Sequence, residues 1–391
     1  MTGAGMILPG ATLGILGGGQ LGRMFVMAAR NMGYAVVVLA PDRDSPAAQW
    51  ADHHIQASYD DTDALEYLAQ RCAAITTEFE NVPVSSLEYL ARARPVRPSG
   101  AALAVTQDRI REKNFLHSNG FETAPYAVVE QRQALRAALQ QVATPALMKS
   151  SRSGYDGKGQ RWVSNLAEAE KAFDDLGGQP CVLEAGIAIQ TEISVLIARA
   201  ADGCVAAYPP SENVHRAGIL DVSIVPARIP SAIAERATRI TLLIAEKLAY
   251  CGVMAVEFFI SKDGDLLVNE IAPRPHNSGH YTLDACVTSQ FEQQVRTLCG
   301  LPPGDTSLLS PAVMVNLLGD LWRADQAPPW DPVLNAARAK LHLYGKREAR
   351  PGRKMGHYTV LGENVEQALS QALAIQDALT RSESLPVREH E

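Results

Sequence analysis

Apolar and polar positions in the first hundred residues alternate between strand and helix patterns. Three apolar runs predict strands, and the second (AVVVL) has the form of a buried parallel strand: residues 12–16, 35–39 and 73–76. Between the first two runs, a glycine-rich segment at 17–22 precedes Met24, Ala28 and Met32, which recur at helical spacing. A proline-rich break follows at 95–100. The pattern predicts an open, Rossmann-like α/β domain.

The middle of the chain has a different pattern. Residues 106–119 form a polar helical run that ends at Gly120. Strand-like and helical segments then interleave without strict alternation. The strand-like segments are 146–149, 160–163, 181–184, 192–198, 253–260 and 265–271, and the helical ones are 166–176 and 233–250. Hairpin-like strands mixed with helices favour an α+β domain over a second doubly wound sheet.

The last part of the chain is looser and more proline-rich. A basic strand-like segment covers residues 341–357, and 382–391 has the composition of a frayed tail. Between them, four apolar residues recur at helical spacing: Val365, Leu369, Ala372 and Leu373. We predict three domains: a glycine-loop α/β domain at 1–108, a middle domain at 109–305 and a small C-terminal α/β domain at 306–391.

Composition narrows the possible functions. The chain has 391 residues, 47% hydrophobic and 6% aromatic, with a net charge of -7. Such a chain is neither a disulfide mini-protein nor disordered, and it is a poor candidate for binding nucleic acid. Its six cysteines include no CxxC pair, so we expect reduced thiols. No targeting or spanning segment is evident, so we expect a cytoplasmic protein without a membrane partner.

The first glycine-rich segment has two open interpretations. Gly17, Gly19 and Gly22 lie between a predicted strand and a predicted helix, where free N–H groups can bind a phosphate. Asp42 follows at a distance that suits the ribose of NAD. The domain is nevertheless short for a full dinucleotide fold. The glycines therefore indicate either a phosphate site or a turn needed only for packing.

A second glycine-rich segment runs from Lys149 to Gly159 between two predicted strands. This strand-loop-strand arrangement differs from the strand-loop-helix of a Walker A site. Its glycines leave backbone N–H groups free for phosphate oxygens, and Lys149 and Lys158 add positive charge. The alternative is an ordinary flexible hairpin with solvated lysines.

Two glutamates form the most informative pair. Asp263 and Gly264 predict a two-residue hairpin turn, with Lys262 opposite Asp265. Counting outward from this turn places Glu257 opposite Glu270, with Cβ atoms ~4.5–5.5 Å apart. Two such carboxylates repel, and Mg²⁺ bound to nucleotide phosphates would neutralise them. The alternatives are one protonated carboxyl, a partner such as Arg274, or a slipped register that turns the pair to water.

Two further polar segments are candidates for anion binding. The segment 272–280 (APRPHNSGH) places an arginine fork beside histidine and amide donors, which suits a planar anion such as bicarbonate; its alternative is a polar capping loop. The basic run 344–354 would hold a phosphate or form a solvated face.

Together these features resemble the ATP-grasp superfamily, and in detail the 5-(carboxyamino)imidazole ribonucleotide synthase family, also called the phosphoribosylaminoimidazole carboxylase ATPase subunit. The resemblance covers about residues 13–358. It is carried by LGGGQLGRM, EFENVP, QDR..EK, SGYDGKGQ, NEIAPRPHNSGH and RPGRKMGH, of which NEIAPRPHNSGH is the most specific.

The resemblance implies an ATP-grasp fold and an ATP-dependent reaction in purine biosynthesis. Bicarbonate is phosphorylated to carboxyphosphate, and the amine of 5-aminoimidazole ribonucleotide captures that intermediate or its CO₂. The cofactors implied are ATP and Mg²⁺, and the assembly implied is a homodimer.

The resemblance also implies site residues. ATP would bind to Arg109, Lys149, Gly154, Tyr155, Asp156, Gly157, Lys158, Gly159, Gln160, Glu184, Ala185, Gly186, Ile187, Glu192, His215, Asn269 and Glu270. Arg274, His276 and Asn277 would bind bicarbonate, and these three with Tyr155 would be the catalytic residues. The ribonucleotide would contact Gln20, Leu21, Glu80, Tyr155, Asp156, Lys346, Arg353 and Lys354. Magnesium would bind to Glu257 and Glu270.

Two positions depart from related patterns. Ala272 stands where many ATP-grasp enzymes have a carboxamide ligand, although the closer family shares the alanine. Lys158 replaces the arginine of some relatives. The alternatives from other classes are another ATP-grasp ligase or a formate-using transformylase, a non-catalytic nucleotide sensor, and an NAD enzyme.

Overall fold

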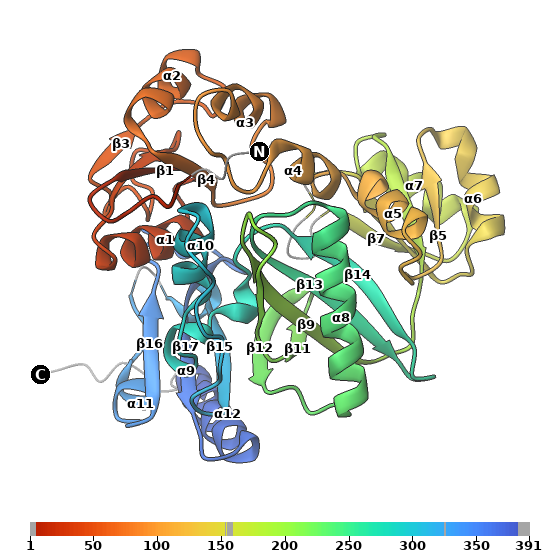
Figure 1. Cartoon of the computed structure of the whole chain (residues 1–391). Coiled ribbons are helices and arrows are strands. Elements are labelled where there is room, and N and C mark those ends of the chain that lie inside the picture. Colours follow the sequence, from red (N-terminus) through yellow and green to blue (C-terminus); the bar gives the residue numbers. More distant parts are fainter. Residues whose placement is uncertain (1–4, 153, 155–158, 324–325, 382–391) are drawn as a thin grey trace, which may run out of the picture.

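The computed structural model describes residues 5–152, 154, 159–323 and 326–381. Three β-sheets organise the chain, and Figure 1 shows them in an N-terminal lobe, a central body and a lobe that projects to one side. The fold is mixed α and β, as predicted. The predicted domain boundaries remain predictions.

The N-terminal lobe is an open parallel sheet in the order β3-β2-β1-β4. Its elements are β1 Thr12–Leu16, α1 Gln20–Asn31, β2 Ala35–Leu39, β3 His53–Ile55, α2 Thr62–Arg71, β4 Ala74–Thr77 and α3 Val84–Ala91. The apolar runs form strands because both faces of this sheet pack into hydrophobic clusters. The two predicted strands at 12–16 and 35–39 are confirmed, and β4 lies one residue beyond its predicted position.

The projecting lobe is a four-stranded antiparallel sheet in the order β5-β8-β6-β7. Helices α4 Gly100–Thr106 and α5 Arg109–Ser118 lead to it, so the predicted helical run is divided, and the Asp108 side chain caps α5. The other elements are β5 Tyr126–Val129, η1 Arg132–Ala134, α6 Leu135–Gln141, β6 Ala146–Ser150, β7 Gln160–Val163, α7 Leu166–Asp175 and β8 Cys181–Ala185.

The body is a nine-stranded antiparallel sheet in the order β14-β13-β9-β11-β12-β15-β17-β16, with β10 paired to β9. Its strands are β9 Ile189–Arg199, β10 Val205–Ala207, β11 Ser211–Arg216, β12 Ile219–Val225, β13 Gly252–Ser261, β14 Leu266–Ala272, β15 Ala312–Leu318, β16 Ala339–Leu343 and β17 Lys354–Leu361. The sheet continues past residue 305 because β12 pairs with β15. This antiparallel arrangement agrees with the α+β prediction.

Helices cover this sheet and join it to the N-terminal lobe. They are α8 Ser231–Lys247, η2 Asn277–Gly279, α9 Thr282–Ala285, α10 Gln290–Leu298, η3 Gly319–Leu321, α11 Asp331–Leu334 and α12 Val365–Arg381. Helix α10 packs on α1 through a cluster that includes Met24 and Phe291.

The single strand-like segment predicted at 341–357 is wrong. Strands β16 and β17 pair antiparallel, and the loop between them contains Gly345 and Gly352 at positive φ, which turn the chain back. In α12, Ala372 is buried as predicted, whereas Leu373 is 38% exposed. The tail at 382–391 lies outside the described residues.

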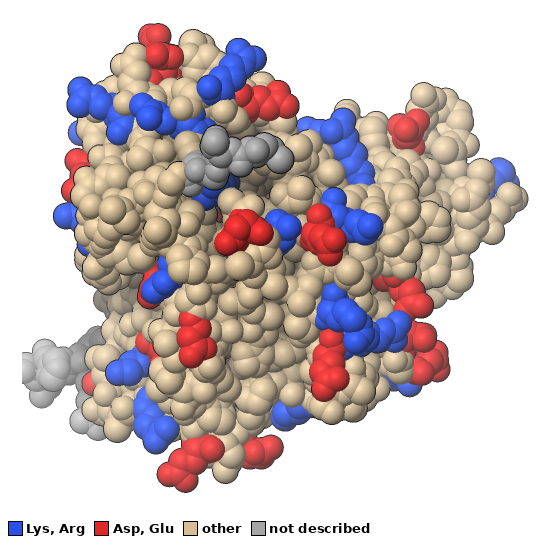
Figure 2. Space-filling model, in the orientation of Figure 1, with Lys and Arg blue, Asp and Glu red and all other residues tan. Residues whose placement is uncertain are grey.

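Charges of both signs are interspersed over the face shown in Figure 2. All six cysteines are free thiols. Within the described ranges, no helix has the length and apolar character needed to cross a membrane.

Candidate active site

The β13–β14 hairpin supplies the central carboxylates, and its turn differs from the prediction. The Ser261 N–H donates to Asp265 O at 2.9 Å, and Gly264 N–H donates to Ser261 O at 3.0 Å. The loop therefore has three residues and ends on Gly264 at φ +89. The predicted two-residue turn, with Lys262 opposite Asp265, is wrong.

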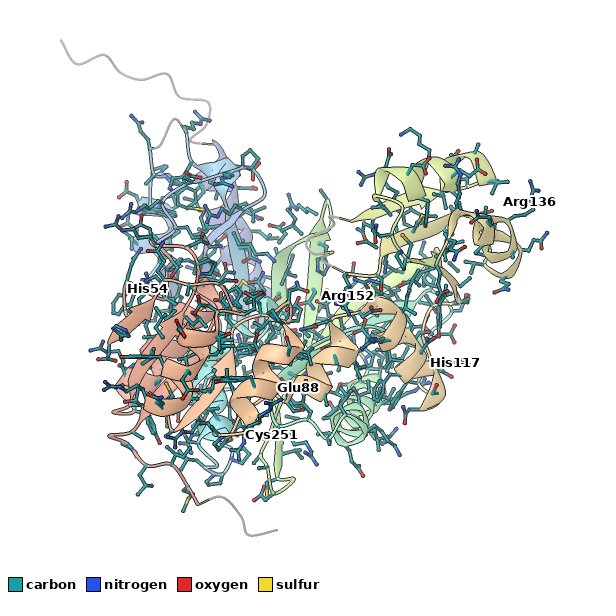
Figure 3. All side chains as sticks on the ribbon, turned by 90° about the horizontal axis from the view of Figure 1, so that it is seen from above. His54, Glu88, His117, Arg136, Arg152 and Cys251 are labelled. Carbon is teal, nitrogen blue, oxygen red and sulfur yellow. The ribbon has the colours of Figure 1, made fainter. Side chains whose placement is uncertain are left out.

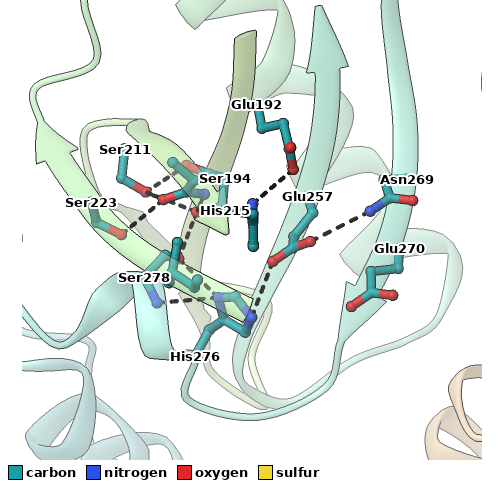
Figure 4. Close-up of polar contacts among 12 residues, drawn as sticks. Glu192, Ser194, Ser211, His215, Ser223, Glu257, Asn269, Glu270, His276 and Ser278 are labelled. Carbon is teal, nitrogen blue, oxygen red and sulfur yellow. Dashed lines mark hydrogen bonds and ion pairs between the residues drawn. The ribbon is translucent and has the colours of Figure 1, made fainter. Parts of the chain in front are cut away.

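A β-bulge restores the predicted pair. Phe258 lies opposite Val268, but the next strand position, Glu257, lies opposite Glu270, so Asn269 is the extra residue. Figure 4 shows Glu270 on β14 beside Glu257 on β13. The prediction that the two glutamates face each other is confirmed, although an error of one residue at the turn is cancelled by the bulge.

The glutamate pair has the character of a cation site. Burial, and then the neighbouring Glu270, raise the pKa of Glu257 to about 7. Glu270 accepts from Arg109 Nη2 at 3.3 Å. The described part of the chain has no cluster of three or more His, Cys, Asp or Glu ligands. Two carboxylates with the buried Asn269 Oδ1, which has no hydrogen-bond partner among the described residues, nevertheless fit Mg²⁺ that takes its remaining ligands from phosphates and water.

Arg274 directs its hydrogen bonds to a different carboxylate. Its Nε and Nη2 donate to the Glu80 carboxylate, the latter at 3.1 Å. Burial would raise the pKa of Glu80, but the guanidinium outweighs burial and keeps that pKa below its usual value. The salt bridge joins the N-terminal lobe to the loop after β14, so two predicted site residues from distant segments meet here.

His276 is held as a neutral imidazole. Burial, and then Arg274, lower its pKa well below the usual value. The Ser278 N–H donates to His276 Nδ1 at 3.3 Å, so the proton resides on Nε2, which lies 3.2 Å from Glu257 Oε1. A ladder of buried polar side chains supports this ring through Ser278: Ser194, Ser211, Asn213 and Ser223. Figure 4 shows the serines of this ladder near His276.

The neighbouring Asn277 is 7% exposed, and neither polar atom of its side chain has a hydrogen-bond partner among the described residues. Gln290 from α10 fixes the loop backbone by bonding both the N–H and the carbonyl of His276, at 2.8 and 2.9 Å. A buried amide without partners costs ~1–3 kcal/mol. Asn277 is therefore suited to a ligand that supplies both a donor and an acceptor.

The predicted ATP side is a buried charge network. Lys149 Nζ lies 2.8 Å from Glu184 Oε2, and Lys113 Nζ lies 3.5 Å from Glu184 Oε1. Burial opposes ionisation of Glu184, but Lys149, Lys113 and Arg109 lower its pKa to about 2. The network leaves Arg109 Nη1 buried without a hydrogen-bond partner in the described structure.

One cleft connects the two sides. It is lined in part by Glu80, Arg109, Gly154, Glu270 and Arg274. Figure 3 shows Arg152 near the centre of the molecule and Arg136 at the far end of the projecting lobe. The residues that line the cleft come from the N-terminal lobe, the projecting lobe and the body, so the cleft lies where these three parts adjoin.

The second glycine-rich segment follows β6, which pairs antiparallel with β7 as predicted. Gly159 has φ +74, and its carbonyl accepts from Ser150 N–H at 2.8 Å. Gln160 opens β7 opposite Lys149. Four predicted ligands lie outside the described residues: Tyr155, Asp156, Gly157 and Lys158.

The remaining residues predicted to bind ATP lie on β9 and β11 and at the end of β8. His215 Nδ1 lies 2.9 Å from Glu192 Oε2, on neighbouring strands, and His215 is close enough to Glu257 for that carboxylate to affect its pKa. The predicted hinge Ala185, Gly186 and Ile187 continues from β8, where Gly186 N–H donates to Pro145 O at 3.0 Å.

The first glycine loop is filled by the chain itself. Glu78, which is 8% exposed, accepts from the Gly19 N–H at the amino end of α1. A Cβ atom on Gly19 would overlap the Glu78 carboxylate. Asp42 is exposed. The dinucleotide interpretation therefore loses its phosphate position, and the glycines make room for Glu78.

The predicted ribonucleotide residues partly converge. Lys346 Nζ donates to Gln20 Oε1 and, at 2.6 Å, to the Lys354 carbonyl. Leu21 packs against the cluster that contains Tyr344. Arg353, in contrast, donates from Nη1 to Glu348 O at 2.8 Å.

Several residues that shape the site received no role from the sequence. Glu78 belongs to the motif EFENVP, and Glu112 and Lys113 belong to QDR..EK, but the sequence assigned none of the three a role. The serines of the ladder belong to no motif. Their partners lie far away in the chain, so spacing gave no signal.

The chain is similar to proteins of known family. Three family models match successive parts of the chain: the ribonucleotide synthetase preATP-grasp domain at residues 10–107, the ATP-grasp domain at 114–291, and the phosphoribosylaminoimidazole carboxylase C-terminal domain at 312–371.

Individual relatives match over nearly their full length. The N5-carboxyaminoimidazole ribonucleotide synthase of Bacillus subtilis (strain 168) is 44% identical over 366 residues, which cover 94% of this chain and 95% of that protein. An ADP complex of an N5-carboxyaminoimidazole ribonucleotide synthetase has a TM-score of 0.89 at 41% identity, with coverages of 97% and 99%. The Aspergillus clavatus enzyme, solved with ADP and 5-aminoimidazole ribonucleotide, has a TM-score of 0.86 at 30% identity, with coverages of 95% and 99%.

Proposed function

The chain belongs to the N5-carboxyaminoimidazole ribonucleotide synthase family, and from this membership we propose that it is an ATP-dependent ligase that carboxylates 5-aminoimidazole ribonucleotide with bicarbonate in purine biosynthesis. The observation that carries the proposal is the facing pair Glu257 and Glu270 beside the loop of Arg274, His276 and Asn277. A cation site and an anion site meet there.

The reaction proceeds in two balanced steps. An oxygen of bicarbonate takes the γ-phosphoryl group of ATP, which yields carboxyphosphate and ADP. The exocyclic amine of the ribonucleotide then attacks the carboxyl carbon of carboxyphosphate, or of the CO₂ it releases. A C–N bond forms, the C–O bond to phosphate breaks, and the amine loses one proton. Positioning and charge neutralisation supply most of the catalysis in phosphoryl transfer.

The ATP side uses charge that the protein already holds in place. Arg109 and Lys149 bind phosphate oxygens, together with Gly154, Gly159 and Gln160. Lys149 is held by Glu184, which lies at the adenine hinge. Magnesium, when bound by Glu257 and Glu270, neutralises the phosphates during transfer.

The acceptor side uses neutral and cationic donors. Arg274 and Asn277 bind the planar anion, and His276 contributes a fixed imidazole whose protonation state does not vary near neutral pH because its pKa is well below the usual value. Glu80, Gln20, Lys346 and the neighbouring basic residues bind the ribonucleotide and its phosphate. We assign the protein to the cytoplasm as a homodimer, on the family resemblance.

The decisive assay measures ADP release and carbamate formation with MgATP and 5-aminoimidazole ribonucleotide, with and without bicarbonate. The proposal requires bicarbonate-dependent product in a 1:1 ratio to ADP. Formate in place of bicarbonate tests the transformylase alternative. ADP release without carbamate would assign the ATP chemistry to another acceptor, and no turnover under any condition would leave a binding function.

A further inference from the structure

Strand β14 is an edge strand, and the helix α5 completes its exposed edge with side chains. The outer edge is first paired by the loop that follows α5, where the Val268 N–H donates to Glu122 O at 2.8 Å. Beyond that point, two consecutive residues of α5 replace a neighbouring strand. Glu112 Oε1 accepts from Ile271 N–H at 2.6 Å, and Lys113 Nζ donates to Asn269 O at 3.1 Å.

These two contacts lie on either side of Glu270, within the β-bulge. Leu266 and Val268 point into the hydrophobic core, so strict alternation would direct residue 270 into the core as well. With the bulge, Ile271 takes the core position instead, and Asn269 and Glu270 turn to the face of Glu257. The bulge is therefore what makes Glu270 available to a ligand.

We call Glu112 and Lys113, with their contacts to Ile271 and Asn269, the clamp. Both side chains are ionisable, which is unusual for a buried contact. Glu112 is 3% exposed and Lys113 is fully buried. Burying such groups is unfavourable unless they are paired and hydrogen-bonded. An apolar side chain would fill the space but would leave the N–H of Ile271 or the carbonyl of Asn269 buried without a partner, at ~1–3 kcal/mol each.

Lys113 also extends the clamp to the adenine side. Its Nζ lies between the Asn269 carbonyl and Glu184 on β8, which belongs to the sheet of the projecting lobe. One buried ammonium thus ties the bulged strand to the strand that leads into the hinge.

We propose that Glu112 and Lys113 are positioning residues that hold the bulge in β14 and thereby set the direction of the Glu270 carboxylate toward a divalent cation. The inference rests on the proposed function only in assigning Glu270 to that cation. Groups that orient a metal ligand from behind change metal affinity by ~10–100-fold when removed.

The test compares two substitutions of Glu112 by neutral side chains. Glu112→Gln keeps an oxygen that can accept from Ile271 N–H, whereas Glu112→Leu does not. Because burial raises the pKa of Glu112 to about 7, glutamine is a close mimic of its protonated form. The readout is Mn²⁺ affinity in the presence of ADP, measured by electron paramagnetic resonance, with ADP affinity without metal as the internal reference.

We expect Glu112→Leu to weaken Mn²⁺ binding by ~10-fold or more, with Glu112→Gln within about threefold of the unmodified protein. Leu116→Ala, which truncates a fully buried apolar side chain of the same helix and removes no hydrogen bond to β14, controls for general loss of stability. Should Glu112→Leu fail to fold, Lys113→Met tests the same clamp from the Asn269 carbonyl and should also weaken Mn²⁺ binding about tenfold.

Equal Mn²⁺ affinity for the leucine and glutamine variants would overturn the inference, as would an equal loss in Leu116→Ala. The double variant Glu112→Leu with Glu270→Gln should bind Mn²⁺ no more weakly than Glu270→Gln alone, because the clamp acts through Glu270. If the losses of Mn²⁺ affinity from the two substitutions were additive, the inference that the clamp acts through Glu270 would be wrong. If the unmodified protein binds Mn²⁺ with ADP yet forms no carbamate, the proposed function fails while the clamp remains tested.

Discussion

The amino end of α1 and the β13–β14 hairpin both bury a carboxylate, but they surround it differently. Burial raises the pKa of Glu78, and amide groups of Gly19 and Gly22 oppose that rise. Burial also raises the pKa of Glu257, but there the second largest effect comes from another carboxylate, Glu270, which raises that pKa further.

This difference separates a structural carboxylate from a functional one. At α1, the chain supplies its own anion to the helix N-terminus, so the glycine motif that resembles a phosphate site is already satisfied. At the hairpin, two carboxyl groups face each other with Arg109 beside Glu270, and this concentration of acidic groups suits a divalent cation. The role of a glycine motif therefore depends on which group binds its N–H donors. That group can lie 59 positions away in the chain, as Glu78 does from Gly19.

The largest expected effect comes from removing one hairpin carboxylate. Glu270→Gln keeps the shape of the side chain but lacks the charge for a divalent cation. We expect bicarbonate-dependent ADP release to fall by ~100-fold or more. Steady-state kinetics at several Mg²⁺ concentrations measure this loss, and thermal unfolding checks that the fold is intact. Unchanged ATP turnover would remove the cation site from the mechanism.

The matching change at α1 should affect stability and leave nucleotide binding alone. Gly19→Ala places a Cβ where the Glu78 carboxylate lies, so either the helix or Glu78 must move. We expect a loss of ~2 kcal/mol in the free energy of unfolding. Urea unfolding measures it, with Gly100→Ala as the control because the nearest atom to its Cβ would be 3.4 Å away. An unchanged stability with a large loss of MgADP affinity would reverse the two roles.

The pH dependence of stability should separate a repelled carboxylate from a paired one. Without metal or nucleotide, folded Glu257 keeps its proton up to a pKa of about 7, whereas an unfolded glutamate releases it near 4.5. The folded state then binds more protons between these values, so the free energy of unfolding falls as pH rises through this window. Glu184, whose pKa is lowered to about 2, stabilises the fold above 4.5 and loses that contribution as pH falls toward 2.

Urea unfolding of the unmodified protein and of Glu257→Gln in EDTA measures this effect. The variant should show a smaller decline between pH 5 and 7, with a remainder from Glu112, whose pKa burial also raises to about 7. A decline of the same size in both proteins would assign it to other groups.

The same contrast explains which parts the sequence could predict. Local patterns located β1 and β2 because the apolar run of a buried strand is read from neighbouring residues, and they located β7 because a glycine-rich segment precedes it directly. The prediction that Glu257 faces Glu270 rested on a wrong turn, and a bulge corrects the register. The sequence could not predict this bulge because it depends on Glu112 and Lys113, which are distant in the chain. The salt bridge between Glu80 and Arg274 likewise joins segments that only the tertiary fold brings together.

The smallest expected effect is at Asp42, the residue that would bind the ribose if α1 held a dinucleotide. Asp42 is exposed, and the helix end that should bind the pyrophosphate already holds Glu78. Asp42→Ala should therefore change neither stability by more than ~0.5 kcal/mol nor the kinetics with MgATP. Fluorescence titration with NADH should detect no binding to either protein. Saturable NADH binding that disappears in Asp42→Ala would mean that Glu78 yields its position to a phosphate, and the distinction between the two carboxylate sites would fail at α1.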